Sequence, residues 1–266
     1  MRQPLAQLPA ELESAIRRIA QTPHLLLALD FDGTMAPIVE HAEDARPLPR
    51  TAAALAALSA LEGTTTALVS GRALGSLRMV AAPPAPTLLV GSHGAETWLG
   101  PDSPPLVLTA EQSATLELAR AAVAQATSLY KGTVAEDKPA GVALHYRLAS
   151  KADGHAAVEL VMEALSGNPA IHISTGKKVL EISVIKANKG QSLAALREYT
   201  QATATLFAGD DVTDEHGFEV LRPGDVGIKV GKSQTHAEFR IPKPQDLPMV
   251  LELLLAARTN GRPHTT

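Results

Sequence analysis

Short, unbroken apolar runs alternate along this sequence with stretches of helical character. The run at 24–30 (HLLLALD) shows no alternation of apolar and polar positions, which predicts a strand buried on both faces of a sheet. A helix is expected at 49–61, because Pro49 stands near its start and Gly63 lies just beyond its end. Further strands are expected at 64–69, 87–90, 204–208 and 226–230. This pattern indicates an α/β fold, a Rossmann-like core built on a parallel sheet.

The middle of the chain has a different pattern, which begins after a Pro-rich patch at 101–105. Thr109 opens a long predicted helix that runs to residue 131, with Gln112 completing a capping box and Gly132 ending the helix. A second helix at 153–165 and strands at 134–136, 142–146, 170–174 and 179–184 are expected here. We interpret residues 99–185 as a domain inserted into a core formed by 1–98 and 186–266.

Polar residues stand where the predicted core strands end. Asp30, Ser70, His93 and Asp210 each follow one of these strands. Because ligands of open parallel sheets bind at the carboxyl ends of the strands, we expect these residues to share one site.

Asp30 and Asp32 lie two positions apart and are followed by Gly33, which permits a sharp turn. One carboxylate could attack a substrate while the other transfers a proton, and both could serve Mg²⁺ as oxygen ligands. The alternative is an Asx-turn at a strand–loop junction.

Residues 210–214 (DDVTD) add three carboxylates after another strand. Asp211 or Thr213 could instead cap a helix, but that explanation leaves Asp210 unexplained. Two carboxylate clusters at neighbouring strand ends would repel each other unless a cation lay between them, which is our main reason to expect a metal.

Two features suit an anionic substrate. Ser70 offers a hydroxyl at a strand end, and Lys189 follows Asn188, a predicted helix cap. A lysine at a helix N-terminus opposes the helix dipole, a small cost that a bound phosphate would offset. The alternative is a solvated surface lysine.

Composition narrows the class of partner. The formal net charge of −4 gives no overall positive field that would gather nucleic acid or an anionic membrane. The absence of cysteine excludes a disulfide framework and a cysteine nucleophile. No apolar run approaches the ~20 residues of a membrane helix. We therefore expect a cytoplasmic protein that binds a small molecule, with no nucleic acid or membrane partner, and a monomer is compatible with the sequence.

Four motifs occur in the order found in the haloacid dehalogenase (HAD) superfamily of phosphohydrolases. They are DFDGT at 30–34, SGR at 70–72, NKG at 188–190 and GDDVTD at 209–214. More narrowly, the chain resembles trehalose-6-phosphate phosphatases from about residue 23 to 257. The stretches that carry this likeness are 36–39, 91–96, 136–138, 145–147, 176–182 and 209–218. The resemblance implies a HAD core and, at 99–185, a C2B-like α/β cap domain that recognises the substrate.

The resemblance also implies roles for the core residues. Asp30 resembles the nucleophile that forms an aspartyl-phosphate, and Asp32 the acid that protonates the leaving sugar oxygen and then activates water. Ser70 and Lys189 resemble the phosphate clamp.

The cofactor implied by the resemblance is Mg²⁺. Asp30, the backbone carbonyl of Asp32 and Asp210 would bind it directly. Asp211 and Asp214 would contact it through water, or would support the direct ligands without touching the metal. Trehalose 6-phosphate is the substrate that the resemblance implies.

Substrate contacts would come from further residues of the matching stretches: Gly71, Arg72, His93, Gly94, Glu96, Lys138, His145, Arg147, Lys177 and Glu181. Some have plainer interpretations. His145 could be a hydrogen-bonded core histidine, His93 could only shape its loop, and Lys177 could be a solvated turn residue.

Two further hypotheses remain open. The chain could keep the chemistry and act on another sugar phosphate, such as sucrose phosphate, mannosylglycerate phosphate or a hexose phosphate. Alternatively, it could be a catalytically silent sugar-phosphate sensor or a subunit of the synthase.

Overall fold

The computed structural model describes residues 8–260, and the chain divides into two compact units. The first unit consists of two stretches, the chain up to Ser103 and the chain from Asn188 onward. The second unit is Pro104–Ala187. The boundaries expected from the sequence, after 98 and after 185, lie within a few residues of these.

The first unit is built on a seven-stranded sheet with the order β11-β10-β9-β1-β2-β3-β4. Neighbouring strands are parallel except β3 and β4, which are antiparallel. The strands are β1 (Leu25–Leu29), β2 (Thr64–Val69), β3 (Leu88–Gly91), β4 (Glu96–Trp98), β9 (Ala204–Gly209), β10 (Val226–Val230) and β11 (Phe239–Ile241). The chain builds the sheet outward from β1 in one direction, then returns to place β9 on the other side of β1, which makes the β1–β9 junction a topological switch point.

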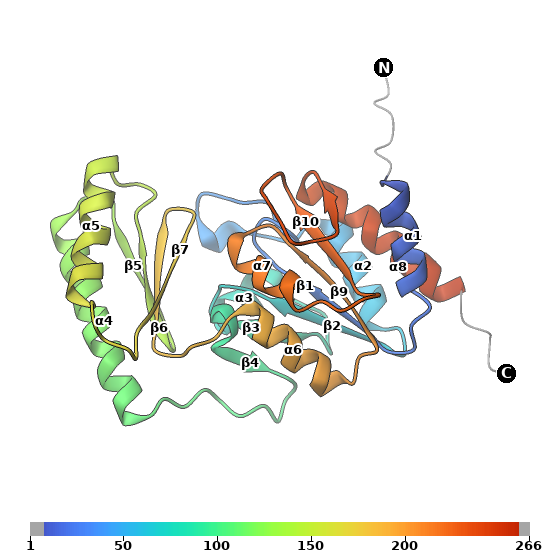
Figure 1. Cartoon of the computed structure of the whole chain (residues 1–266), viewed down its shortest axis with the longest axis horizontal. Coiled ribbons are helices and arrows are strands. Elements are labelled where there is room, and N and C mark those ends of the chain that lie inside the picture. The colour runs from blue at the N-terminus through green and yellow to red at the C-terminus, as the bar shows by residue number, and fades with distance from the viewer. Residues whose placement is uncertain (1–7, 261–266) are drawn as a thin grey trace, which may run out of the picture. The chain divides into compact units, whose positions relative to one another are not determined.

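Helices cover both faces of this sheet, as Figure 1 shows. Leu25, Leu27 and Leu29 pack in the cluster that includes α1 (Ala10–Ile19), α2 (Pro49–Ser59), α3 (Leu74–Ala81) and α8 (Leu247–Asn260). Leu26 and Ala28 pack on the opposite side with α6 (Lys189–Thr200) and α7 (Glu215–Glu219). Apolar partners on both faces explain why β1 has no alternation of polar and apolar residues.

The second unit is a four-stranded antiparallel sheet with two helices on one face. Its strands, in the order β5-β6-β8-β7, are β5 (Val134–Lys138), β6 (Gly141–His145), β8 (Val179–Ser183) and β7 (His172–Gly176). Val142, Leu144, Leu180 and Ile182 pack against α4 (Ala110–Leu129) and α5 (Lys151–Ala164). The other face therefore carries the alternate residues of each strand.

The predicted α/β fold with a parallel sheet is confirmed, with differences in detail. The capping box of Thr109 and Gln112 is present at the start of α4. Helices α1 and α3 and the short strands β4 and β11 were not anticipated, and the strand expected at 170–174 begins at His172. Within residues 8–260, no helix combines the length and the apolar character needed to span a bilayer.

Candidate active site

The carboxyl end of β1 places Asp30 between two other predicted site residues. Strand β1 pairs in register with β2 on one side and β9 on the other, with Leu29 opposite both Leu68 and Ala208. Ser70 follows β2 and Asp210 follows β9. Three segments that are far apart in the sequence thus deliver polar side chains to one edge of the sheet.

Lys189 is buried beside the nucleophile candidate. Asn188 caps α6 by accepting a hydrogen bond from the Gln191 amide at 2.8 Å, which fixes Lys189 as the first residue of the helix. The Lys189 Nζ donates to Oδ1 of Asp30 at 2.7 Å and to Oδ1 of Asp214 at 2.7 Å. With 2% of its side chain exposed, this lysine is not a solvated surface residue.

The electrostatics of this cluster are dominated by burial. Burial raises the pKa of Asp30 well above its ordinary value, and the charges of Asp214 and Asp210 raise it further against the opposing effect of Lys189. Burial alone would lower the pKa of Lys189, but the carboxylates of Asp214 and Asp30 outweigh it, and the net shift is upward. Lys189 therefore keeps its positive charge.

The acidic residues fit a divalent cation. Oxygens of Asp30, Asp210 and Asp214 all lie within 4.8 Å of one another. Oδ2 of Asp30 is buried and makes no hydrogen bond within the described residues. Lys189 contacts two of these three carboxylates, those of Asp30 and Asp214. Hard oxygen ligands of this kind are those that Mg²⁺ takes in proteins.

Gly33 has a backbone φ of +85°, and a Cβ there would come within 2.3 Å of the Asp210 carboxylate. Glycine is thus required both by the turn after Asp32 and by the close approach of Asp210.

The acidic loop after β9 is held by its own backbone and by a lysine that sequence reasoning missed. Oδ2 of Asp214 accepts a hydrogen bond from the Asp211 amide at 2.8 Å. Lys229 on β10 donates from Nζ to the Asp211 carbonyl at 3.1 Å and to Oε1 of Glu215 at 2.6 Å. Its 1% side-chain exposure is unusual for lysine, and a lone lysine in the apolar run VGIKV was the signal available in the sequence.

Asp32 is held by Arg72 through two hydrogen bonds. Nε of Arg72 donates to Oδ2 at 2.6 Å and Nη2 donates to Oδ1 at 2.7 Å. The sequence placed Arg72 among substrate-contacting residues, and the structure brings its guanidinium onto the carboxylate of Asp32.

The loop from β3 to β4 braces the segment around Gly71. Ser92 and His93 have φ values of +48° and +56°, in the left-handed region that non-glycine residues seldom occupy, and Gly94 has a φ of +118°. A Cβ on Gly71 would come within 2.4 Å of the His93 ring. Glu96 is buried, and its Oε2 accepts hydrogen bonds from the Ser92 hydroxyl at 2.6 Å and the Leu74 amide at 3.3 Å.

In the second unit, the candidate residues lie on the sheet face opposite α4 and α5. Lys138 donates to both carboxylate oxygens of Glu181, at 2.9 and 2.7 Å, and Nε2 of His145 lies 2.7 Å from Oε2 of Glu136. Ala143 separates Glu136 from Glu181 in the strand register. Glu136 was part of a matching stretch but was not among the predicted site residues. Arg147 follows β6, and Lys177 lies in the turn between β7 and β8.

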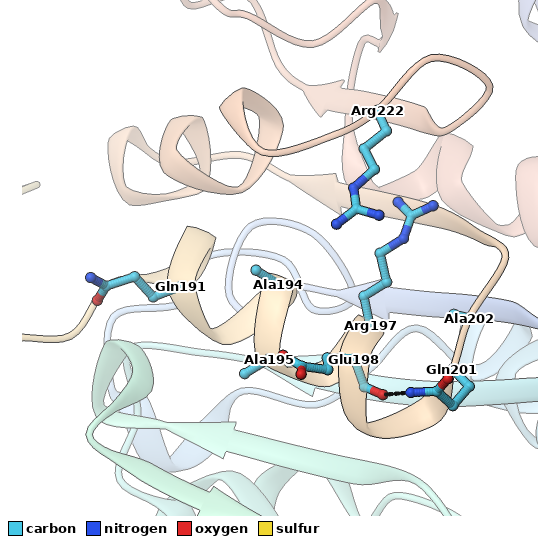
Figure 2. A pocket seen from close by; sticks show the side chains of 8 residues that line it. All are labelled: Gln191, Ala194, Ala195, Arg197, Glu198, Gln201, Ala202 and Arg222. Carbon is cyan, nitrogen blue, oxygen red and sulfur yellow. Dashed lines mark hydrogen bonds between the residues drawn. The ribbon is translucent and has the colours of Figure 1, made fainter.

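A separate pocket of about 630 Å³ lies along α6, as Figure 2 shows. Its lining includes Arg197, whose Nη1 donates to Oδ2 of Asp225 at 2.5 Å, and the exposed Arg222. None of its eight lining residues is a predicted site residue, so the pocket is not the candidate active site.

Comparisons with known proteins give relatives of this chain and solved structures that share its fold. A probable trehalose-phosphate phosphatase of Sinorhizobium fredii is 36% identical over 210 residues, which cover 77% of each chain. The trehalose-phosphate phosphatase of Mycobacterium avium is 31% identical over 83% of this chain and 59% of its own.

Among solved structures, the C-terminal domain of C. albicans trehalose-6-phosphate phosphatase aligns with a TM-score of 0.80 at 22% identity. That alignment covers 95% of this chain and 99% of that one, and at this identity it shows the fold. The sequence model of the family described as trehalose-phosphatase matches residues 28–245, which include every site candidate named above. The chain therefore belongs to the trehalose-phosphatase family.

Proposed function

We propose that this protein hydrolyses trehalose 6-phosphate to trehalose and inorganic phosphate, with Mg²⁺ as cofactor and an aspartyl-phosphate as intermediate. The observation that carries the proposal is the buried contact of Lys189 with Asp30, beside the Asp210 and Asp214 carboxylates, at the switch point of the sheet. Family membership supports the same reaction.

In the first step, a carboxylate oxygen of Asp30 attacks phosphorus, and the bond from phosphorus to the sugar oxygen breaks. Asp32 donates a proton to that departing oxygen, a contribution of about 10²–10⁴-fold for a well-placed acid. In the second step Asp32 takes a proton from water, the water oxygen attacks phosphorus, and phosphate leaves Asp30. Dividing the transfer in this way replaces one difficult displacement by two easier ones.

The charge problem of this chemistry is that an anionic nucleophile must approach an anionic phosphate. Lys189 reduces the repulsion because its charge lies 2.7 Å from the attacking carboxylate, and we assign it with Ser70 to hold the phosphate oxygens. Mg²⁺ bound by Asp30, Asp210 and the Asp32 carbonyl, supported by Asp211 and Asp214, would supply further positive charge to the phosphate.

Substrate choice must rest on groups that recognise sugar hydroxyls, because phosphate contacts alone do not distinguish one sugar from another. We propose that residues 99–185 act as a cap domain and bind trehalose through its polar sheet face. Lys138, Glu181, His145 and Glu136 provide donors and acceptors there, and each is held by its contact with a partner, Lys138 with Glu181 and His145 with Glu136. Arg147 and Lys177 remain candidates for the same role, as do Gly71, His93, Gly94 and Glu96 in the core.

We place the reaction in the cytoplasm, since a charged sugar phosphate does not cross a membrane unaided. Another sugar phosphate is the second candidate substrate. A catalytically silent sensor is disfavoured, because Asp30, Lys189 and the carboxylates of the acidic loop lie in contact, as the chemistry requires.

Phosphate release from trehalose 6-phosphate by the Asp30→Asn variant tests the mechanism. We expect turnover to vanish while ligand binding, measured by calorimetry, persists. The exposed Asp137→Asn serves as a matched control that should keep full activity, since 71% of its side chain faces solvent. Undiminished hydrolysis by Asp30→Asn, or by the unmodified protein in excess chelator, would overturn the proposal.

A further inference from the structure

We propose that Arg72 is a positioning residue for Asp32, which aligns this acid with the leaving oxygen rather than binding the substrate itself. The inference rests on the proposed function, in which Asp32 carries the proton. It assigns to Arg72 the orientation of Asp32, and so the position at which that proton is delivered.

The guanidinium of Arg72 is fixed on three sides. Its Nε and Nη2 donate to the two oxygens of Asp32 at 2.6 and 2.7 Å, a paired geometry that defines the plane of the carboxylate. Its Nη1 donates to the Ser76 hydroxyl at 3.2 Å. The charge lies 5.5 Å from the centroid of the Phe31 ring, within cation–π range.

These contacts link Asp32 to a rigid part of the core. Phe31 is fully buried and stands between Asp30 and Asp32 in the sequence. The Arg72 backbone is fixed as well, since its amide donates to the Ser70 hydroxyl at 3.2 Å and its carbonyl accepts from the Ser92 amide at 2.7 Å. Arg72 thus sets the orientation of Asp32 relative to both the nucleophile and Ser70.

The same contacts argue against substrate binding as the main role of this arginine. Its side chain is only 10% exposed, whereas that of Asp32 is 33% exposed. The exposed partner is the one that faces solvent and can reach a substrate, and the buried partner supports it from behind. A misdirected acid would impair reactions in which the leaving oxygen needs a proton, and would affect reactions with a good leaving group less.

The leaving-group dependence of kcat/KM separates these roles. Phenyl phosphate and p-nitrophenyl phosphate lack a sugar and are similar in size, but phenoxide needs protonation far more than nitrophenoxide. For Arg72→Met we expect kcat/KM to fall about 10-fold more with phenyl phosphate than with p-nitrophenyl phosphate, a fraction of what full loss of a general acid costs. Arg72→Lys, which keeps a donor to Asp32, should recover part of that loss.

Two further variants serve as the positive and the negative control. Asp32→Asn should show the same dependence on leaving group in stronger form, and Ser76→Ala, which removes one contact of Arg72 but leaves its pair with Asp32, should show little change. Circular dichroism and Mg²⁺ binding by calorimetry confirm that each variant is folded and binds metal.

An equal fall for both aryl phosphates in Arg72→Met and Arg72→Lys would overturn the inference and assign Arg72 to phosphate binding. Unchanged kinetics in both variants would also overturn it. Either result leaves the proposed function intact if Asp30→Asn is inactive, whereas an active Asp30→Asn would reject the proposed function itself.

Discussion

Nζ of Lys189 lies 2.7 Å from Oδ1 of Asp30, and both side chains are almost completely buried. Removing one partner of a buried ion pair leaves the other uncompensated, at a cost of about 3–5 kcal/mol. We therefore expect Lys189→Met to lose turnover and to unfold at a markedly lower temperature. Added Mg²⁺ should restore much of the stability, because a cation among these carboxylates replaces the missing charge, but not the activity. Thermal denaturation with and without Mg²⁺ measures both effects, and a melting temperature unaffected by the substitution would contradict the burial argument.

Asp30→Asn should stabilise the metal-free protein while it abolishes turnover. Unlike the loss of Lys189, this change leaves no buried charge without a partner, because Lys189 keeps its contact with Asp214 at 2.7 Å. Burial raises the pKa of Asp30 well above its ordinary value, so the stability that this group contributes is present at low pH and is lost as pH rises through the raised pKa. The variant lacks this titration. Its advantage in melting temperature should thus widen as pH increases and disappear in acid. An advantage that is constant with pH would show that ionisation of Asp30 is not its source.

Much of this site follows from the sequence, because buried parallel strands are recognisable and their ends meet at one edge. The prediction that Asn188 caps a helix was correct, and it placed Lys189 at the start of a helix that faces the site. The pairing of Arg72 with Asp32 could not be predicted, because it joins residues 40 positions apart through one choice of side-chain conformation. The partners of Glu96 could not be predicted either, because its motif does not specify that the carboxylate accepts hydrogen bonds from the Ser92 hydroxyl and the Leu74 amide.

Lys229→Met should weaken Mg²⁺ binding without removing any proposed ligand. Nζ of Lys229 ties the Asp211 carbonyl to Glu215 and so fixes the loop that carries Asp210 and Asp214. Loss of a residue that orients metal ligands typically costs about 10–100-fold in affinity. Calorimetric titration of Mg²⁺ measures the change, and Arg50→Met, at an exposed ion pair, is the control. Equal affinities in the two variants would mean that the loop keeps its shape without Lys229.

Arg258→Met should lower stability and leave catalysis unchanged. The buried guanidinium of Arg258 donates to the carbonyls of Ala20, Thr22 and Gly63 at 3.0, 3.0 and 2.8 Å, and so joins α8 to the ends of two other segments. Unsatisfied buried acceptors cost about 1–3 kcal/mol each, and partial access of water reduces the sum. We expect the urea midpoint to fall clearly while kcat/KM stays within about twofold, because stability and catalysis depend here on distant groups. A variant as stable as the parent would show that these carbonyls find other donors.

Phosphate release from a panel of sugar phosphates in the presence of Mg²⁺ measures directly whether the buried Asp30 site acts on trehalose 6-phosphate. Glucose 6-phosphate carries the same phosphate ester on half of the disaccharide, and sucrose 6-phosphate is a disaccharide of different shape. If the polar face of the second unit recognises both rings, kcat/KM for trehalose 6-phosphate should exceed that for glucose 6-phosphate by about 100-fold or more, since a site that hydrogen-bonds substrate hydroxyls discriminates strongly against their loss. Trehalose 6-phosphate turned over no better than glucose 6-phosphate, or less well than sucrose 6-phosphate, would contradict the assignment of this substrate.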